Sequence, residues 1–206
     1  MRVTAQARQE TDAAIRAAAT RLFARKGVAA TSTRDLAAAA KIAVGTLFNY
    51  YDSKEALALS LVAEAIDAAR TPNDRPRGRS ADEDLFALIA TVLRTLAPMR
   101  PHLIEILEAG LSPFASGSLL PEAARIRATH LEDVVAVFEA HGLGATLHSA
   151  NLHLYWALFL AVLSFWATDG SPSQEDTRAL IDQTVRMFVG SLRAPDRDSS
   201  HPSSSR

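Results

Sequence analysis

Three polar side chains close together in the chain could make hydrogen bonds to a nucleic acid. They are the hydroxyl of Thr46, the amide of Asn49 and the phenol of Tyr50. An amide can read the edge of an adenine, whereas hydroxyl and phenol groups bind phosphate oxygens. A short exposed helix has little need of an amide and a phenol together for solubility, so this grouping favours recognition of DNA.

Two further features of this region suit a phosphate backbone. Gly45 presents no side chain and would let the backbone approach a duplex closely. Thr33 and Arg34 lie where a helix is predicted to begin, and the free amides and dipole of a helix N-terminus favour a phosphate.

The residue patterns that catalysis needs do not occur. The chain has no cysteine, which excludes a thiolate nucleophile and a thiolate metal site. It has no Gly-rich phosphate loop, no His-Glu-x-x-His and no Gly-x-Ser-x-Gly. The paired Glu-x-x-His motifs of a di-iron bundle are also missing, since His102 and Glu105 give only a single reversed spacing. We therefore expect no enzyme activity, no cofactor and no metal site.

The charge of the chain is unevenly distributed. Residues 1–54 carry nine Lys or Arg against four Asp or Glu, a net charge of +5, whereas residues 55–206 carry −6. This asymmetry suits a basic segment that meets a polyanion and an acidic remainder that does not.

Helical periodicity and capping patterns predict the segments that position these residues. Apolar side chains recur at helical spacing before Gly27, which supplies a stop. Ser32 and Asp35 form the pattern of a capping box for a short helix over residues 33–40. A second short helix is predicted over residues 44–50.

A longer helix is predicted next, capped by Asp52 with Glu55 in the box position and ending near Arg70. Two short helices joined by a tight turn, behind an amphipathic first helix, form a helix-turn-helix, in which the second helix can lie in the major groove. The pattern thus predicts a three-helix DNA-binding domain.

The remainder is predicted to be helical as well, which makes the fold class all-α with about nine helices. Residues 71–80 resemble a mobile connection, and residues 194–206 a disordered tail. Ser171 to Gln174 form a second capping-box pattern. The predicted helices span residues 81–97, 101–111, 121–141, 145–168 and 173–192.

No apolar run reaches the length of a membrane span, and the polar N-terminus does not resemble a signal peptide. We expect a cytoplasmic protein with no membrane partner.

The stretch from Thr33 to Leu57 resembles the DNA-binding signature of the TetR (tetracycline-repressor) family. The match continues upstream through Ala18, Leu22 and Phe23, so the resemblance covers residues 9–69, with the helix-turn-helix motif at about 32–51. It identifies Lys54 as the family's phosphate-binding lysine. The expected DNA-binding residues are Thr33, Arg34, Lys41, Val44, Gly45, Thr46, Phe48, Asn49, Tyr50 and Lys54.

The chain departs from the family pattern at four positions, one of which is Tyr51, where phenylalanine is usual and where we expect the side chain to belong to the core. Lys41 stands where a turn glycine is usual and would need left-handed geometry, and Ala43 replaces a small polar cap. Phe48 replaces a tyrosine, which removes a hydroxyl contact. Lys41 and Ala43 leave open the alternative of a helical ligand-binding or protein-interaction module that has lost DNA binding.

The resemblance also implies a role for residues 81–193. In this family the larger helical domain makes a homodimer and encloses a small-molecule pocket, and a bound effector releases the repressor from near-palindromic operator DNA. The last two helices are the expected dimer interface, and His102, His130 and His153 are possible polar groups of the pocket. The expected pocket residues are Leu103, Ile106, Leu107, Phe114, Val134, Phe138, Trp156 and Phe159.

Overall fold

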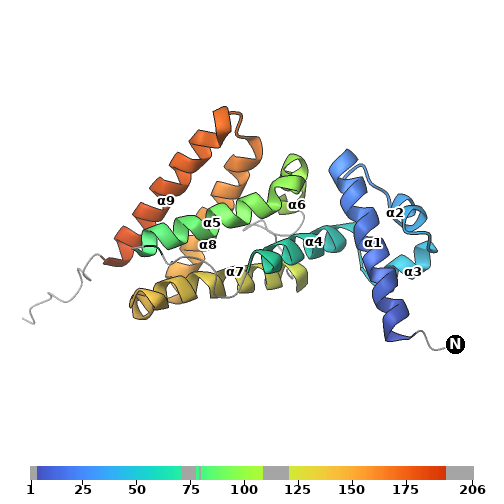
Figure 1. Cartoon of the computed structure of the whole chain (residues 1–206), viewed down its shortest axis with the longest axis horizontal. Coiled ribbons are helices and arrows are strands. Elements are labelled where there is room, and N and C mark those ends of the chain that lie inside the picture. Colours follow the sequence, from blue (N-terminus) through green and yellow to red (C-terminus); the bar gives the residue numbers. More distant parts are fainter. Residues whose placement is uncertain (1–3, 71–77, 79, 109–120, 194–206) are drawn as a thin grey trace, which may run out of the picture.

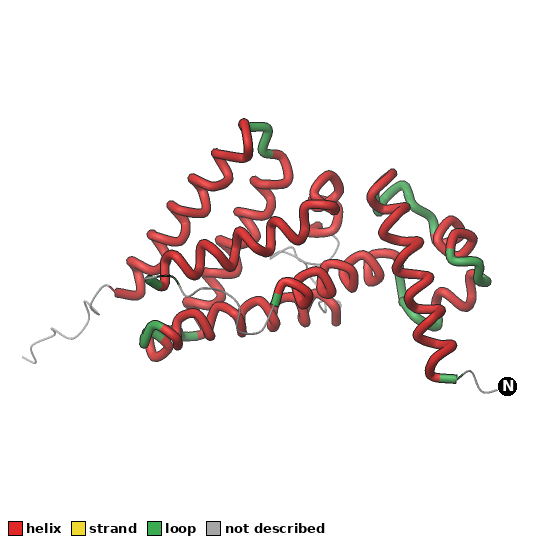
Figure 2. The backbone as a smooth tube through the Cα atoms, viewed as in Figure 1, coloured by secondary structure: helices red, strands yellow, loops and turns green. Residues whose placement is uncertain are grey.

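The computed structural model describes residues 4–70, 78, 80–108 and 121–193. This part of the chain contains helices and turns and no strand, which confirms the all-α class (Figure 2). The helices are α1 (Ala5–Lys26), α2 (Thr33–Ala39), α3 (Val44–Phe48), α4 (Lys54–Ala69), α5 (Ala81–Leu96), α6 (Leu103–Ile106), α7 (Pro121–Ala140), α8 (Ser149–Thr168) and α9 (Glu175–Arg193).

The helices form two groups connected by α4 (Figure 1). We call α1, α2 and α3 the head, and α5 to α9 the body. α4 begins beside the head and runs into the body, where it packs on α5 and α7. One hydrophobic core continues through both groups, because α4 contributes buried residues to each.

The predicted capping box opens α2. The Ser32 hydroxyl accepts from the Asp35 amide at 3.1 Å, and the Asp35 carboxylate accepts from the Ser32 amide at 3.0 Å. The turn between α2 and α3 forms with Lys41 in the left-handed region, at a φ of 57°. Leu36 and Leu47 are buried on either side of this turn, so the helix-turn-helix forms although lysine stands where glycine is usual.

Two predicted helix starts are wrong in detail. Ser53, not Asp52, caps α4, because Ser53 has the extended backbone of a cap and its hydroxyl accepts from the Ala56 amide. At α9, the Asp169 carboxylate accepts from the backbone amides of Ser171 and Thr177. The Ser171 hydroxyl accepts from the Asp176 amide, so Asp169 and Ser171 together cap α9 in place of the predicted box at residues 171–174.

The predicted helix over residues 101–111 is also wrong in form. Residues Ala97–His102 make a 3-10 helix that contains both Pro98 and Pro101, and the short α6 follows directly. Proline cannot donate the hydrogen bond that an α-helix needs, and the tighter 3-10 geometry lets the chain continue.

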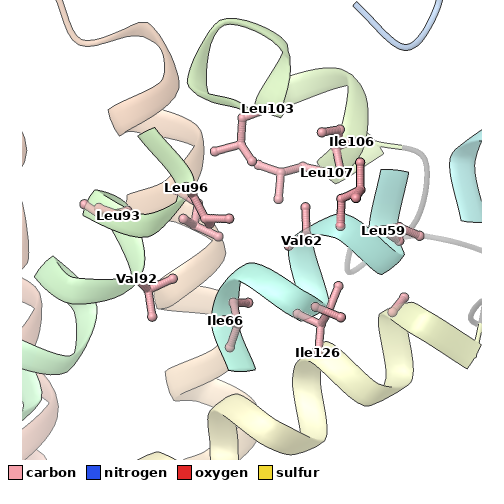
Figure 3. Close-up of a cluster of buried hydrophobic side chains, with 14 of the residues drawn as sticks. Leu59, Val62, Ile66, Val92, Leu93, Leu96, Leu103, Ile106, Leu107 and Ile126 are labelled. Atoms are coloured by element: carbon pink, nitrogen blue, oxygen red, sulfur yellow. The ribbon is translucent and has the colours of Figure 1, made fainter. Parts of the chain in front are cut away.

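Apolar side chains from four helices meet where α4 enters the body (Figure 3). The side chains come from α4, α5, α7 and the segment around α6, and all are buried. This cluster fixes α4 relative to the body. The labelled members are Leu59, Val62, Ile66, Val92, Leu93, Leu96, Leu103, Ile106, Leu107 and Ile126.

The Asp35 capping box predicts an acid-sensitive head. The Lys26 ammonium, 2.7 Å away, and the Ser32 backbone amide hold the pKa of Asp35 well below its usual range. A carboxylate with a lowered folded-state pKa stabilises the fold above its unfolded pKa of about 4, and this contribution is lost as pH falls further. Asp35→Asn should therefore lower the thermal midpoint at pH 7, and its difference from the wild type should shrink below about pH 4.

The matched control is Asp52→Asn, which changes an exposed carboxylate in the turn before α4. Its thermal midpoint should stay close to that of the wild type across the same range. A difference for Asp35→Asn that stayed constant down to the lowest pH would contradict the assignment.

Candidate DNA-binding surface and effector region

The outer face of α3 carries the residues predicted to read DNA. Gly45, Phe48 and Asn49 are exposed, whereas Leu47 points into the core of the head. Phe48 keeps 48% of its surface accessible, so its ring is available to a partner. The exposed surface is therefore a mixture of backbone, ring and amide, which suits the edge and methyl groups of bases.

Gly45 has no packing reason to be a glycine. A Cβ placed on it would meet no described atom within 4 Å, and its backbone is helical. Glycine costs a helix roughly 1 kcal/mol relative to alanine. The open space above Gly45 therefore points to something outside the chain that approaches the backbone there.

The other predicted DNA contacts lie around this face. Thr33 and Arg34 are in the first turn of α2, and Arg34 is exposed, as is Lys41 in the turn. Val44, Thr46 and Tyr50 are half-buried, so they present only part of their side chains. The guanidinium of Arg8 lies 5.7 Å from the centre of the Tyr50 ring, so Arg8 adds a cation beside α3, in addition to that of Lys41 in the turn.

Tyr51 anchors the end of α3 to α1 and α4. Its hydroxyl donates to Asp12 at 2.6 Å, and Arg16 donates to Asp12 and to Glu64, each at 2.8 Å. Burial, with the bond to Asp12, raises the pKa of Tyr51 to about 12. The predicted core role of Tyr51 is confirmed by its burial, and this polar network is a second role that the sequence did not indicate.

Lys54 lies against the turn that follows α1. Its ammonium donates to the carbonyl oxygens of Val28 and Ala29, each at 2.8 Å. An ammonium has three N–H groups, so one remains for a phosphate. The phosphate contact of Lys54 stays a prediction, and its bonds to the turn are a role that the sequence did not indicate.

The same turn is bound from the body. One carboxylate oxygen of Glu105, in α6, accepts from the amides of Val28 and Ala29 at 3.0 Å each. Gly27 makes this approach possible, since a Cβ there would lie 2.8 Å from the His102 ring and 3.0 Å from Glu105. The backbone amides of this turn thus bind the body, while its carbonyls bind α4.

The expected pocket residues fall into two parts of the body core. Leu103, Ile106 and Leu107 belong to the cluster around α4 in Figure 3. The others that the structure describes lie on α7 and α8 and are buried: Val134, Phe138, Trp156 and Phe159. Phe114 lies outside the described residues.

His130 provides a polar point inside the second group. It is fully buried, its Nε2 is 3.0 Å from the Tyr155 hydroxyl, and its ring stacks on Phe159 with the ring centres 4.0 Å apart. His153, by contrast, is exposed beside Arg127. Of these two histidines, only His130 therefore lies among the aromatic pocket candidates.

α8 carries apolar residues on its inner and outer faces. It has no charged residue and is long and apolar enough to cross a membrane, yet the side chains of Tyr155, Phe159 and Trp166 are buried in the body core. Its outer face exposes Leu154 and Phe165 at 48% and 41%.

The apolar residues of α9 are placed differently from those of α8, although the family resemblance predicts a dimer interface on both helices. Ile181, Val185, Phe188 and Val189 are buried within the same chain, so they are not available to a partner. Met187 is 56% exposed instead.

Together, the exposed α3 behind a left-handed turn and the larger helical body define a helix-turn-helix regulator. The family model of bacterial regulatory proteins of the tetR family matches residues 15–61, and a tetracyclin repressor-like C-terminal domain matches residues 85–195. The chain belongs to the tetR family and is a DNA-binding transcriptional regulator.

Relatives support the same assignment. The HTH-type transcriptional repressor Rv3405c of Mycobacterium tuberculosis is 31% identical over 159 residues, which are 76% of this chain and 77% of that protein. A TetR regulator from Rhodococcus sp. RHA1 shares the fold with a TM-score of 0.69 at 18% identity, covering 88% of this chain and 97% of that one.

A third relative was solved with a small molecule. Thermus thermophilus FadR, a TetR family repressor in complex with lauroyl-CoA, has a TM-score of 0.66 at 18% identity, covering 93% of this chain and 100% of that one. The names of these relatives are those of regulators rather than enzymes.

The open space at Gly45 predicts a variant that separates stability from DNA binding. Gly45→Ala should leave the thermal midpoint unchanged or raise it, because alanine favours a helix by up to about 1 kcal/mol. The same variant should bind DNA from upstream of its own gene about tenfold more weakly in a mobility shift, a factor of about 1.4 kcal/mol, because the methyl group meets the duplex.

Gly170→Ala is the matched control, since a Cβ at Gly170 also meets no described atom within 4 Å and this residue lies in the corner between α8 and α9. It should bind DNA like the wild type. Unchanged DNA affinity of Gly45→Ala would place the contact surface elsewhere.

Proposed function

We propose that the chain is a homodimeric repressor whose residues 9–69 bind near-palindromic operator DNA and whose residues 81–193 dimerise and bind a small apolar effector. The observation that carries the proposal is the outer face of α3, where Gly45 leaves open space beside the exposed Asn49 and Phe48. A regulator of this kind acts where its DNA is, in the cytoplasm.

The charge distribution supports an operator bound by the head. A net charge of +5 over residues 1–54 becomes +10 in a dimer, which faces the condensed counterions of a duplex. A two-fold dimer presents two identical recognition helices, and these match two half-sites related by the same symmetry.

Asn49 and Arg34 should contribute to binding in different ways. Asn49→Ala should weaken binding to the preferred DNA sequence by about 1–3 kcal/mol, because an amide reads a base edge. It should also relax the sequence preference at one base pair per half-site. Arg34→Ala should weaken binding to all DNA sequences alike and reduce the salt dependence of the affinity, because it removes a phosphate contact. Binding measured on a library of single-base operator variants, at several salt concentrations, separates the two effects.

Ala38→Ser is a suitable control for both, since it changes an exposed side chain on α2 without altering charge. Equal losses on all sequences for Asn49→Ala would remove Asn49 from base recognition.

The outer face of α8 is the proposed dimer interface. Leu154, Leu158, Ala161 and Phe165 recur at helical spacing, and the last is 41% exposed. Gly190, near the end of α9, is exposed and has open space at its Cβ position, which would let a second helix approach closely. Two copies of each helix would form a four-helix interface.

Phe165→Glu should convert the dimer into monomers, because it places a charge at the centre of an apolar interface that cannot pair it. Light scattering coupled to size exclusion measures the mass, and DNA binding should fall with it. Ala124→Glu, an exposed change on α7, is the control and should remain dimeric. A dimeric, folded Phe165→Glu would move the interface to another face.

The effector proposal rests on the family and on the apolar body. The liganded FadR relative supports a small molecule with a long apolar part, and the aromatic group around His130 provides apolar surface with one polar point. An effector that lowers DNA affinity must itself be bound more weakly by the DNA complex, by the same factor.

A further inference from the structure

A cavity of about 270 Å³ lies at the junction of head and body. Its walls come from α1, α4, the end of α5 and the 3-10 helix, and from α6. It differs from the expected pocket in the body, with which it shares Ile106. Its volume is just below the usual range of about 300–1,000 Å³ for ligand sites, so it suits a compact molecule.

The walls of this junction cavity are largely apolar. Phe23 and Ala24 of α1 face Leu61 and Ala65 of α4, and Met99 closes the side toward the 3-10 helix. Small alanine side chains on two of these helices leave the space that larger residues would fill. An apolar ligand body would therefore replace water here.

Apart from His102, the polar side chains of the walls offer hydrogen-bond acceptors. The Thr20 hydroxyl donates to the Arg16 carbonyl and the Thr95 hydroxyl donates to the Thr91 carbonyl, so both hydrogens are used and the oxygen lone pairs remain. Glu64 accepts from Arg16 through one oxygen, and its second oxygen can accept another bond.

We propose that the junction cavity binds a compact apolar molecule that carries a primary amine. The apolar part would lie between α1 and α4, and the ammonium would donate to the hydroxyl and carboxylate oxygens. This site is separate from the effector region in the body and goes beyond the proposed function, since its occupation requires neither DNA nor an effector.

Occupation of this cavity would affect how the head sits on the body. His102 and Ile106 line the cavity and flank Glu105, whose carboxylate binds the turn after α1. A molecule that contacts α1 and this segment together would stabilise the arrangement in which Glu105 meets the turn.

Three probes of similar shape test the chemistry on the full chain: phenylpropylamine, phenylpropanol and phenylpropionate. Titrations followed by saturation-transfer NMR give their dissociation constants. The amine should bind about tenfold more tightly than the carboxylate, with the alcohol between them. Equal affinity of amine and carboxylate, or no amine binding at millimolar concentration, would overturn the proposal.

Three variants locate the binding. Ala24→Trp fills the cavity from an exposed position of α1 and should abolish amine binding, whereas Ala14→Trp, exposed on another side of α1, should not. Thr95→Val keeps the volume of the side chain but removes one hydrogen-bond acceptor. It should weaken binding of the amine severalfold and reduce the difference in affinity between the amine and the alcohol. Thermal melting checks that all three variants fold, and an amine that binds Ala24→Trp as it binds the wild type would also overturn the proposal.

Discussion

The burial of α4 on several sides is the constraint on which the rest of the structure depends. Its first turns pack on α1, and its later turns lie between α5 and α7, with Leu57, Leu59 and Val62 almost fully buried. Two ion pairs also connect α4 to its neighbours. Glu64 binds Arg16 of the head, and Arg70, directly after α4, binds Asp133 of the body. A packed interior transmits displacement because it has few voids. Movement of α4 would therefore displace both α1 of the head and the core of the body.

The turn after α1 is a second connection between head and body. Its amides are bound by Glu105 and its carbonyls by Lys54, so a few backbone groups link α1, α4 and α6. Hydrogen bonds to charged groups are stronger than neutral ones, at about 1.5–3 kcal/mol. The orientation of the head thus depends on the segment around α6, which also contributes to the core cluster and to the junction cavity.

Among the described residues, large apolar side chains are exposed on α3, α8 and α9, and those on α3 and α8 have different surroundings. On α3, Phe48 is exposed in a basic head beside a glycine with open space, which suits a duplex rather than a core. On α8, Leu154 and Phe165 continue an uncharged helix whose other face is buried. By length and hydropathy alone, α8 could be a membrane span or a helix of a protein core. The burial of its inner face in the body favours the core helix.

The sequence by itself determined the helical class, the helix-turn-helix and its capping box, because these depend on residues a few positions apart, such as Ser32 and Asp35. Helix starts near residues 53 and 171 were misplaced, since neighbouring side chains compete for the same amides and backbone geometry chooses between them. The tertiary structure alone decided that Glu105 binds a turn 76 residues away, that Lys54 binds the same turn, and that α9 buries its apolar face within the chain while α8 keeps one exposed. These outcomes depend on which helices are brought together in space, and periodicity along one helix carries no information about its partners.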